Sequence, residues 1–284
     1  MEMRDINFLI IGATKSATTW LQQSLQLDPC VYMPDPEIHY FSRYHDRGDR
    51  WYLENFTPAG EGLVIGEKSN SYLDTPAAAV RIHQTLPDVL LVTQLRNPVE
   101  RAYSDYCMLH RRGDVTADID RYLDPRQGAG GRFLQGGLYF QQLCRFLDLF
   151  PRERMLILFY EDLKTDAAGQ VHDLRRFLAL EKKPAFEPVA QKIKDKTKPL
   201  VDARLRRLLK PLKPIVKPLR ETKGFEALRS MISDEFKYVP LTSDLAARMV
   251  GYYEADTDQL GSLLGLDLSH WLKSPFSETK RQSV

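Results

Sequence analysis

The chain has 284 residues, and 43% of them are hydrophobic, which is enough apolar material for the core of one large domain. Its 40 basic and 38 acidic side chains leave a net charge of +2, which argues against a general nucleic-acid-binding protein. Three scattered cysteines without a Cys-x-x-Cys pair argue against structural zinc and are typical of a reducing compartment. The chain shows neither a signal-peptide pattern nor the ~20 successive apolar residues of a membrane span. We therefore expect a soluble, cytoplasmic protein.

Short apolar runs alternate with helical patterns along most of the chain. Runs that are apolar at successive positions predict parallel strands covered on both faces. They span residues 7–11, 31–33, 63–66, 89–95 and 155–160. Helical patterns span residues 18–27, 76–86, 98–111, 138–150 and 166–179. This alternation predicts an α/β protein with a P-loop-like three-layer fold, in which helices flank a central, mostly parallel sheet.

Several of the predicted helices begin with a recognisable signal. Thr18 and Asp166 are candidate caps, because their side chains can accept a hydrogen bond from a backbone N–H of the first turn. Asn97-Pro98 places proline at the first helical position, where its missing N–H does no harm. These signals support the predicted helix starts near residues 18, 98 and 166.

The character of the sequence changes after Glu181. Residues 192–223 hold 12 Lys or Arg against 3 acidic side chains, and four prolines interrupt them. This segment is either a solvated basic helical hairpin or a binding surface for an anionic acceptor or partner. Both interpretations stay open from the sequence.

Two further helical patterns follow the basic segment, near residues 225–233 and 242–264. We interpret the chain as one domain with a helical C-terminal region. This domain spans residues 1–284. It consists of an α/β core at 6–180, a basic, proline-broken helical insertion at 190–225 and a helical C-terminal part at 226–284.

The stretch IIGATKSATTWL, residues 10–21, has the layout of a phosphate-binding loop. A strand ends, Gly12 allows a tight turn, and the helix that follows directs backbone N–H groups toward an anion. Lys15 adds a positive charge, and hydroxyl donors come from Ser16, Thr18 and Thr19. The spacing differs from the G-x-x-x-x-G-K-[ST] of ATP-binding loops, because Lys15 follows Gly12 by three residues without a second glycine. An ordinary strand–helix turn with a surface lysine is the alternative.

A second stretch, VLLVTQLRNPVERAYSDY at residues 89–106, ends its apolar run at Arg96. In a magnesium-dependent P-loop enzyme, such a strand would end in an aspartate that holds the metal. Arginine cannot ligate a metal, but it binds a phosphate through two parallel N–H groups. Ser104, about two turns into the following helix, adds a hydroxyl. The sequence therefore predicts two separate anion sites and no metal site.

A ligand with two anionic ends that needs no magnesium is 3′-phosphoadenylyl sulfate (PAPS), and the two stretches resemble the cofactor signatures of PAPS-dependent sulfotransferases. GATKSATTWL is similar to the 5′-phosphosulfate loop of that family, and LRNPVERAYSDY is similar to its 3′-phosphate motif, R-[DN]-P-x-x-R-x-x-S-x-Y. The resemblance extends to EIHYF, EKSNSY, GLYFQQLCRFLDLFP and LILFYEDLKTD and covers about residues 6–180. It looks nearest the heparan-sulfate-type and bacterial branch of the family.

This resemblance implies which residues bind the cofactor. By similarity, the 5′-phosphosulfate is wrapped by Lys15, Ser16, Ala17, Thr18, Thr19 and Trp20. Arg96 and Ser104 hold the 3′-phosphate, and Lys15 also stabilises charge on the bridging oxygen as the sulfuryl group leaves. In the carbohydrate branch a late basic loop closes over the cofactor. DEFKYVP, residues 234–240, stands roughly in that place without the loop's glycine, which makes Lys237 a candidate.

The acceptor must lose a proton, and the stretch PDPEIHYF supplies two candidates for the general base. Glu37 and His39 lie on the same side of an extended chain. In the resembled branch the glutamate of this motif is the base, which implies Glu37. His39 is the second candidate, because histidine titrates near neutrality, and it alternatively orients the loop. Lys68 in GEKSNSY matches a family lysine that faces the sulfate or the acceptor, with Asn70 where proline is common.

The resemblance implies an enzyme that moves a sulfuryl group from PAPS to a hydroxyl or amine of a small molecule, natural product or glycan, with adenosine 3′,5′-bisphosphate as the product. A P-loop-type nucleotide or small-molecule kinase is an alternative, but the loop spacing and Arg96 argue against it. A non-catalytic nucleotide-binding module is another, but it would need no base such as Glu37. We expect no nucleic-acid partner. The acceptor, the choice between O- and N-sulfation and the oligomeric state stay open.

Overall fold

Five parallel strands form the central sheet of the computed structural model, which describes residues 1–181, 200–201, 233–234 and 238–273. The strands are β1 Phe8–Gly12, β2 Val31–Tyr32, β3 Val64–Lys68, β4 Leu90–Leu95 and β5 Met155–Phe159. They lie in the order β2-β3-β1-β4-β5, and every neighbouring pair is parallel. All the predicted strands are present, with ends shifted by one or two residues.

Twelve α-helices and four short 3₁₀ helices belong to the described residues. The α-helices are α1 Thr18–Gln26, α2 Tyr40–Arg43, α3 Gly48–Leu53, α4 Ala78–Thr85, α5 Pro98–Arg112, α6 Asp120–Leu123, α7 Pro125–Gly128, α8 Arg132–Gln135, α9 Tyr139–Leu147, α10 Tyr160–Thr165, α11 Ala167–Phe177 and α15 Ser243–Leu264. The 3₁₀ helices are η1 Met3–Asp5, η2 His45–Arg47, η3 Arg152–Arg154 and η6 Ser269–Leu272. The helices shorter than two turns were not predicted, because so few residues show no helical period.

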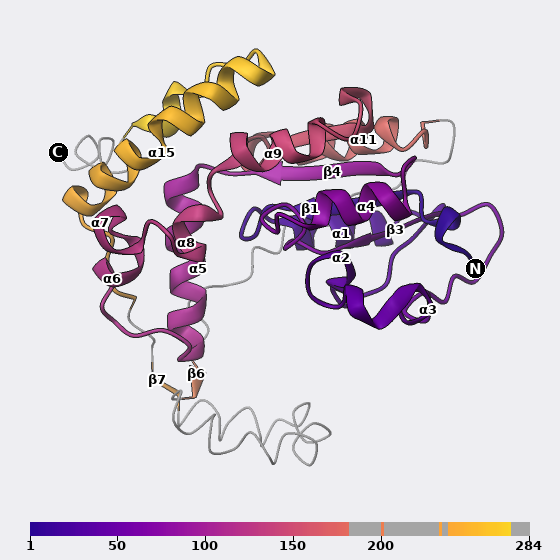
Figure 1. Ribbon diagram of the computed structural model, residues 1–284, viewed down its shortest axis with the longest axis horizontal. Coiled ribbons are helices and arrows are strands. Elements are labelled where there is room, and N and C mark those ends of the chain that lie inside the picture. The colour runs from indigo at the N-terminus through magenta and orange to yellow at the C-terminus, as the bar shows by residue number, and fades with distance from the viewer. Residues whose placement is uncertain (182–199, 202–232, 235–237, 274–284) are drawn as a thin grey trace.

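Helices cover both faces of the sheet (Figure 1). Successive residues of a strand point to opposite faces, so β1 contributes to two separate cores. Phe8 and Ile10 pack with residues of α1 and α11, whereas Leu9 and Ile11 pack with residues of α4 and α9. The predicted three-layer α/β fold is therefore confirmed.

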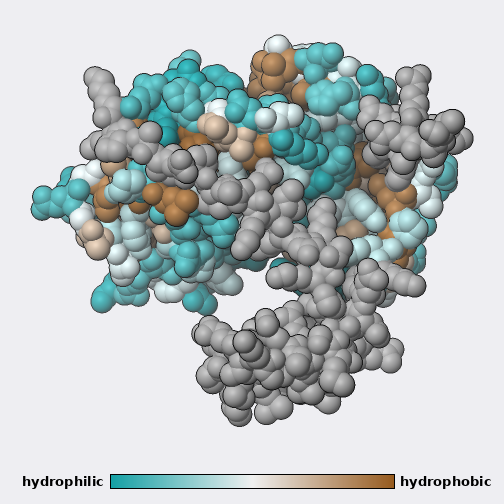
Figure 2. Space-filling model, turned by 180° about the vertical axis from the view of Figure 1, so that it is seen from behind, coloured by the Kyte–Doolittle hydropathy of each residue, from teal (hydrophilic) through white to brown (hydrophobic). Residues whose placement is uncertain are grey.

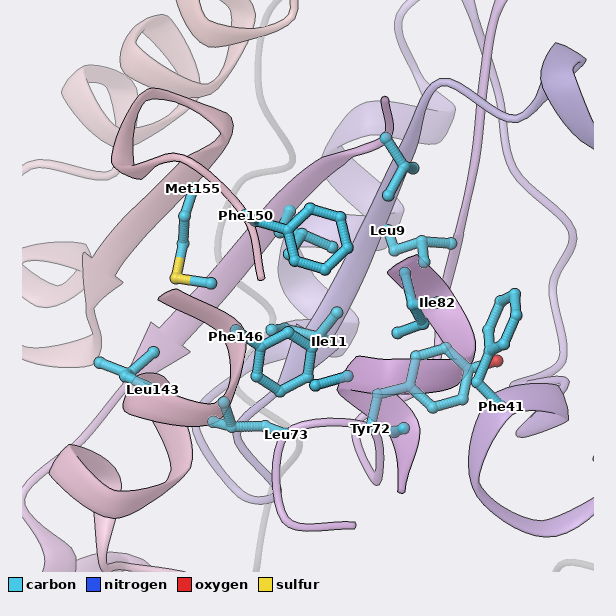
Figure 3. Close-up of a cluster of buried hydrophobic side chains, with 14 of the residues drawn as sticks. Leu9, Ile11, Phe41, Tyr72, Leu73, Ile82, Leu143, Phe146, Phe150 and Met155 are labelled. Atoms are coloured by element: carbon cyan, nitrogen blue, oxygen red, sulfur yellow. The ribbon is translucent and has the colours of Figure 1, made fainter. Parts of the chain in front are cut away.

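The core on the α4 and α9 face is built from large apolar side chains of distant segments (Figure 3). Each of the labelled residues is at most 2% exposed: Leu9, Ile11, Phe41, Tyr72, Leu73, Ile82, Leu143, Phe146, Phe150 and Met155. Phe41 belongs to α2, and Tyr72 and Leu73 belong to the loop that follows β3. This core therefore fixes the loops that leave the carboxyl ends of the strands.

Helices α5 and α15 carry a third cluster of buried side chains beside the sheet. The side chain of Asn97 accepts hydrogen bonds from the backbone N–H groups of Val99 and Glu100, so the predicted start of α5 at Pro98 is confirmed. Helix α15 packs against α9, α5, α6 and α7 (Figure 1), which joins the described C-terminal part to the α/β core. The helix predicted at 242–264 is confirmed.

Of the predicted basic insertion at 190–225, the structure describes only Leu200–Val201. Leu200–Val201, strand β6, pairs in antiparallel fashion with Ser233–Asp234, strand β7. The other residues of the segment 190–225 lie outside the described residues, as do residues 225–232 of the helix predicted at 225–233, whose last residue, Ser233, belongs to strand β7. Among the described residues, none of the helices is both long and apolar enough to cross a bilayer. Figure 2 shows that hydrophilic residues dominate the described surface on one face, with apolar residues in separate small patches.

Candidate active site

The carboxyl ends of the strands bring the predicted site residues to one edge of the sheet. The loop after β1 carries Lys15, the loop after β2 carries Glu37 and His39, β3 ends at Lys68, and Arg96 follows β4. In an open parallel sheet, ligands bind at this edge, where neighbouring connections leave toward opposite faces. Strands β1 and β3 are such neighbours, because α1 and α4 lie on opposite faces of the sheet.

The first loop has a tightly constrained backbone. A side chain at Gly12 would meet the Cβ atom of Leu73 at 2.7 Å, so only glycine lets the loop after β3 approach β1 this closely. Lys15 and Ala17 have φ angles of 70° and 64°, in the left-handed region that residues with a Cβ rarely adopt. Ala17 is the cap of α1 and Thr18 is its first residue, so the predicted cap at Thr18 is wrong. The N–H groups of this first turn are the donors of a helix N-terminal anion site.

The first loop and Arg96 are in direct contact. One guanidinium N–H of Arg96 donates to the backbone oxygen of Lys15 at 3.3 Å, and the ammonium of Lys15 lies 3.5 Å from the sulfur of Met108 on α5. The guanidinium also donates to Glu100 at 2.7 Å and lies 4.5 Å from the ring centroid of Tyr160. A phosphate at Arg96 would therefore compete with Glu100, whose side chain is 38% exposed and can turn toward solvent.

A cluster of hydrogen-bonded charges surrounds Glu37. One carboxylate oxygen lies 2.5 Å from the ammonium of Lys68 and accepts from the side-chain amide of Asn70 at 3.1 Å. The other oxygen lies 3.1 Å from the Nε2 atom of His39. The same Lys68 ammonium donates to the hydroxyl of Thr19 in helix α1 at 3.2 Å. One lysine thus joins the candidate base to the candidate anion loop.

The surroundings of Glu37 favour its ionised form. Burial alone would raise the pKa of its carboxyl group, but hydrogen bonds from His39 and Lys68, together with their charges, outweigh burial and lower it. Glu37 is therefore a carboxylate at neutral pH, as a proton acceptor must be before the reaction. Its pairing with Lys68 also holds it in one orientation.

His39 is held by contacts on two sides. Its φ angle of 55° lies in the left-handed region, and it caps α2. Its backbone N–H donates to the hydroxyl of Ser69 at 2.8 Å, and its Nδ1 atom lies 2.8 Å from the hydroxyl of Ser71. That hydroxyl is in turn 2.7 Å from the hydroxyl of Ser42. This arrangement orients the ring so that Nε2 faces Glu37, which fits an orienting role for His39.

The other predicted cofactor residues are placed as follows. Ser16 and Thr18 are buried, and the indole N–H of Trp20 is buried without a hydrogen-bond partner in the described chain. Ser104 is half-buried on α5, two turns beyond Arg96. Lys237 lies outside the described residues, so its predicted role stays a prediction.

Several contacts at the site were not predicted. Asn70 stands where the resembled motif commonly has proline, and its side chain binds the candidate base. Glu100 forms a salt bridge with Arg96. The two residues are four positions apart, a spacing at which opposite charges regularly pair. That spacing was the available signal, whereas the placement of Tyr160 against Arg96 depends on the neighbouring strand β5.

The described residues contain no group of three or more His, Cys, Asp or Glu side chains placed to hold a metal ion. A hollow of about 550 Å³ lies at the opposite edge of the sheet, where Asn7, Asp88 and Arg154 line it beside the first residues of the strands. It contains none of the predicted site residues. The predicted site residues that the structure describes lie at the carboxyl ends of the strands instead.

Known proteins are similar in sequence to this chain over about three fifths of its length. Heparan sulfate glucosamine 3-O-sulfotransferase 6 of Mus musculus is 36% identical over 179 residues, which cover 61% of this chain and 52% of that protein. Heparan sulfate glucosamine 3-O-sulfotransferase 3B1 of Homo sapiens is 32% identical over 179 residues, 61% of this chain and 46% of that protein. The chain spans about half the length of the curated relatives it matches.

Solved structures and the family match agree with these relatives. The crystal structure of a sulfotransferase from Alicyclobacillus acidocaldarius has a TM-score of 0.69 and 25% identity, and the match covers 94% of this chain and 99% of that one. The sulfotransferase domain from the curacin biosynthetic pathway, at 16% identity and a TM-score of 0.50, shares the fold. Residues 5–203 match the sulfotransferase domain family. The chain therefore belongs to the sulfotransferase family.

Proposed function

We propose that this chain is a sulfotransferase that moves a sulfuryl group from PAPS to a hydroxyl or amine of an acceptor. One observation carries the proposal: the ammonium of Lys68 contacts both Glu37, at 2.5 Å, and Thr19 of the first loop, at 3.2 Å. A proton acceptor and an anion-binding loop are thereby placed side by side. Transfer of a charged group to a nucleophile that must lose a proton requires this pairing.

The residues of the first loop and of Arg96 fit the two anionic ends of PAPS. The loop offers the N–H groups of α1, the ammonium of Lys15 and the buried indole N–H of Trp20, which has no partner in the described chain. An anionic oxygen would satisfy that donor. Arg96, which contacts the backbone oxygen of Lys15, offers a fork of N–H groups for a second anionic group. We assign the 5′-phosphosulfate to the loop and the 3′-phosphate to Arg96 and Ser104.

The acid–base cluster supplies the remaining chemistry. Glu37 accepts the proton of the acceptor while the acceptor oxygen or nitrogen forms its bond to sulfur and the bridging S–O bond breaks. Lys15 and Lys68 stabilise the negative charge that develops on the bridging oxygen and on the sulfuryl oxygens. His39, held by Ser71, keeps Glu37 in line with the acceptor. Adenosine 3′,5′-bisphosphate leaves as the second product.

The acceptor class follows from the relatives only as a proposal. Their names give glucosamine of heparan sulfate as the substrate, so a glycan hydroxyl is the first acceptor to test, with hydroxyl- or amine-bearing small molecules second. The family match does not favour the kinase alternative. The expected cytoplasmic location stays a prediction.

Transfer is expected to persist in excess EDTA, because Arg96 directly follows strand β4, where a magnesium-dependent enzyme places a metal-binding aspartate. The measurement uses PAPS labelled on sulfur, heparan-type and small-molecule acceptors, and quantification of both labelled product and adenosine 3′,5′-bisphosphate. Equal rates with EDTA and with magnesium support the proposal. Loss of transfer on chelation that magnesium restores, or transfer from ATP in place of PAPS, would support a kinase-type mechanism instead.

A further inference from the structure

A second glutamate, Glu67, lies directly beneath the acid–base cluster and is fully buried. Because successive residues of β3 point to opposite faces, Lys68 reaches toward α1 while Glu67 points into the aromatic core. One oxygen of Glu67 accepts from the hydroxyl of Ser69 at 2.8 Å, and the other accepts from the hydroxyl of Tyr72 at 2.6 Å. The mechanism above uses none of these three groups.

The Ser69 hydroxyl connects Glu67 to the catalytic loop. It donates to Glu67 and at the same time accepts the backbone N–H of His39 at 2.8 Å. Above its raised pKa the carboxyl group of Glu67 is ionised and can only accept hydrogen bonds, so it forces the hydroxyl hydrogen of Ser69 toward itself. The oxygen lone pair of Ser69 is then turned toward His39, which fixes the direction of this contact.

His39 needs such a contact because its backbone is strained. A residue with a Cβ atom at a φ angle of 55° is disfavoured and persists only where its surroundings hold it. The hydrogen bond that its backbone N–H donates to Ser69 fixes the backbone, and the contact of its Nδ1 atom with the Ser71 hydroxyl fixes the ring. Displacement of His39 would move its Nε2 atom away from Glu37.

We propose that Glu67 is a positioning residue, which sets the hydroxyl of Ser69 so that His39 and, through it, Glu37 stand in the geometry for proton transfer. This inference rests on the proposed function, because it assigns Glu67 to the same site. Glu67 does not touch the acceptor or the cofactor in this scheme. Its effect is transmitted by two hydrogen bonds in series, one donated by the Ser69 hydroxyl to Glu67 and one donated by the His39 backbone N–H to Ser69.

The energetics of Glu67 agree with a functional role. Burial raises the pKa of its carboxyl group to about 7, although the hydrogen bonds from Tyr72 and Ser69 oppose burial; the charge of Glu37 raises this pKa, and the charge of Lys68 lowers it. Tyr52 on α3 faces the same carboxylate. The folded-state pKa lies above the unfolded one, so folding stability decreases as the pH rises through this interval and stays lower above it. A neutral side chain at this position would not lower the folding stability in this way, so stability alone does not explain a glutamate here.

Two variants and a matched control test the inference. Ser69→Ala removes only the connecting hydroxyl, and Glu67→Gln keeps the volume but replaces one of the two accepting oxygens by an N–H donor, so the hydroxyls of Ser69 and Tyr72 can no longer both donate to it. Tyr40→Phe is the control, because Tyr40 lies in the same core, next to His39, and donates to a carboxylate, that of Asp49 at 2.6 Å, without touching Glu67. We expect Ser69→Ala and Glu67→Gln to lower kcat by about 10- to 100-fold, the scale of a small misplacement, with unchanged affinity for adenosine 3′,5′-bisphosphate. Tyr40→Phe should keep kcat within a few-fold.

A readout that needs no turnover separates this inference from the proposed function. The ring signals of His39 in the NMR spectrum, identified by their loss in His39→Gln, should move in Ser69→Ala and Glu67→Gln but not in Tyr40→Phe. Unmoved His39 signals, or a kcat that follows thermal stability equally in all three variants, would overturn the positioning role. A wild-type chain that transfers no sulfuryl group while the His39 signals move as expected would instead reject the proposed function and leave the structural link intact.

Discussion

Glu37→Gln is expected to lower turnover by ~10²–10⁴-fold at saturating PAPS, because it removes the proton acceptor and keeps the shape of the side chain. The amide oxygen of the glutamine can still accept from Lys68, which now holds Glu37 at 2.5 Å, so the fold and the cofactor loop should be preserved. The measurement is kcat for sulfuryl transfer, with the affinity for adenosine 3′,5′-bisphosphate as the test that the loop is intact.

The matched variant is His39→Ala, which keeps Glu37 but removes the ring that faces it at 3.1 Å. An orienting histidine should matter less than the base itself, so we expect a smaller loss of turnover than for Glu37→Gln. A Glu37→Gln enzyme within a few-fold of the wild type, beside an inactive His39→Ala enzyme, would transfer the role of general base to His39.

The second large effect is expected at Arg96 and Lys15, the two cations to which we assign cofactor binding. Arg96→Ala should lower the affinity for adenosine 3′,5′-bisphosphate by roughly ten- to a hundred-fold, because it removes a charge-assisted contact of about 1.5–3 kcal/mol. Lys15→Ala should lower both affinity and turnover, because in the proposed mechanism Lys15 binds the cofactor in the ground state and also stabilises the charge of the transition state. Calorimetry and saturating-PAPS kinetics on both variants separate the two effects.

Glu100→Gln is the control for Arg96, because Glu100 now accepts from the guanidinium at 2.7 Å. Removing its charge should leave the affinity unchanged or increase it, since the competing partner of Arg96 is weakened. An Arg96→Ala variant that binds the bisphosphate as tightly as the wild type would show that the 3′-phosphate lies elsewhere.

The fold, and the position of the candidate site residues at the ends of the strands, could be predicted because their signals are local. The continuous apolar runs of β1 and β4 indicated buried parallel strands, and Gly12, Lys15 and Arg96 stand directly at the strand ends where an anion site needs them. The strand order then follows from tertiary packing and had no signal of its own.

The contacts that were not predicted depend on residues far apart in the sequence. The hydrogen bond from Asn70 to Glu37 joins residues 33 positions apart, and the bond from His39 to Ser69 joins residues 30 positions apart. The capping of α1 by Ala17 in place of Thr18 reflects the tight backbone of the first loop, which overrides the ordinary preference for a hydroxyl cap. The capping preferences of single residues do not predict such tertiary constraints.

Calorimetry with adenosine 3′,5′-bisphosphate and with AMP, under identical buffer and salt, tests whether this chain binds the 3′-phosphate of PAPS. The two ligands differ by the 3′-phosphate, which we assign to Arg96 and Ser104. We expect the bisphosphate to bind roughly ten- to a hundred-fold more tightly than AMP, because of the same charge-assisted contact, and we expect this preference to shrink in Arg96→Ala. Equal affinities for the two ligands in the wild-type chain would contradict the assignment of PAPS as the donor.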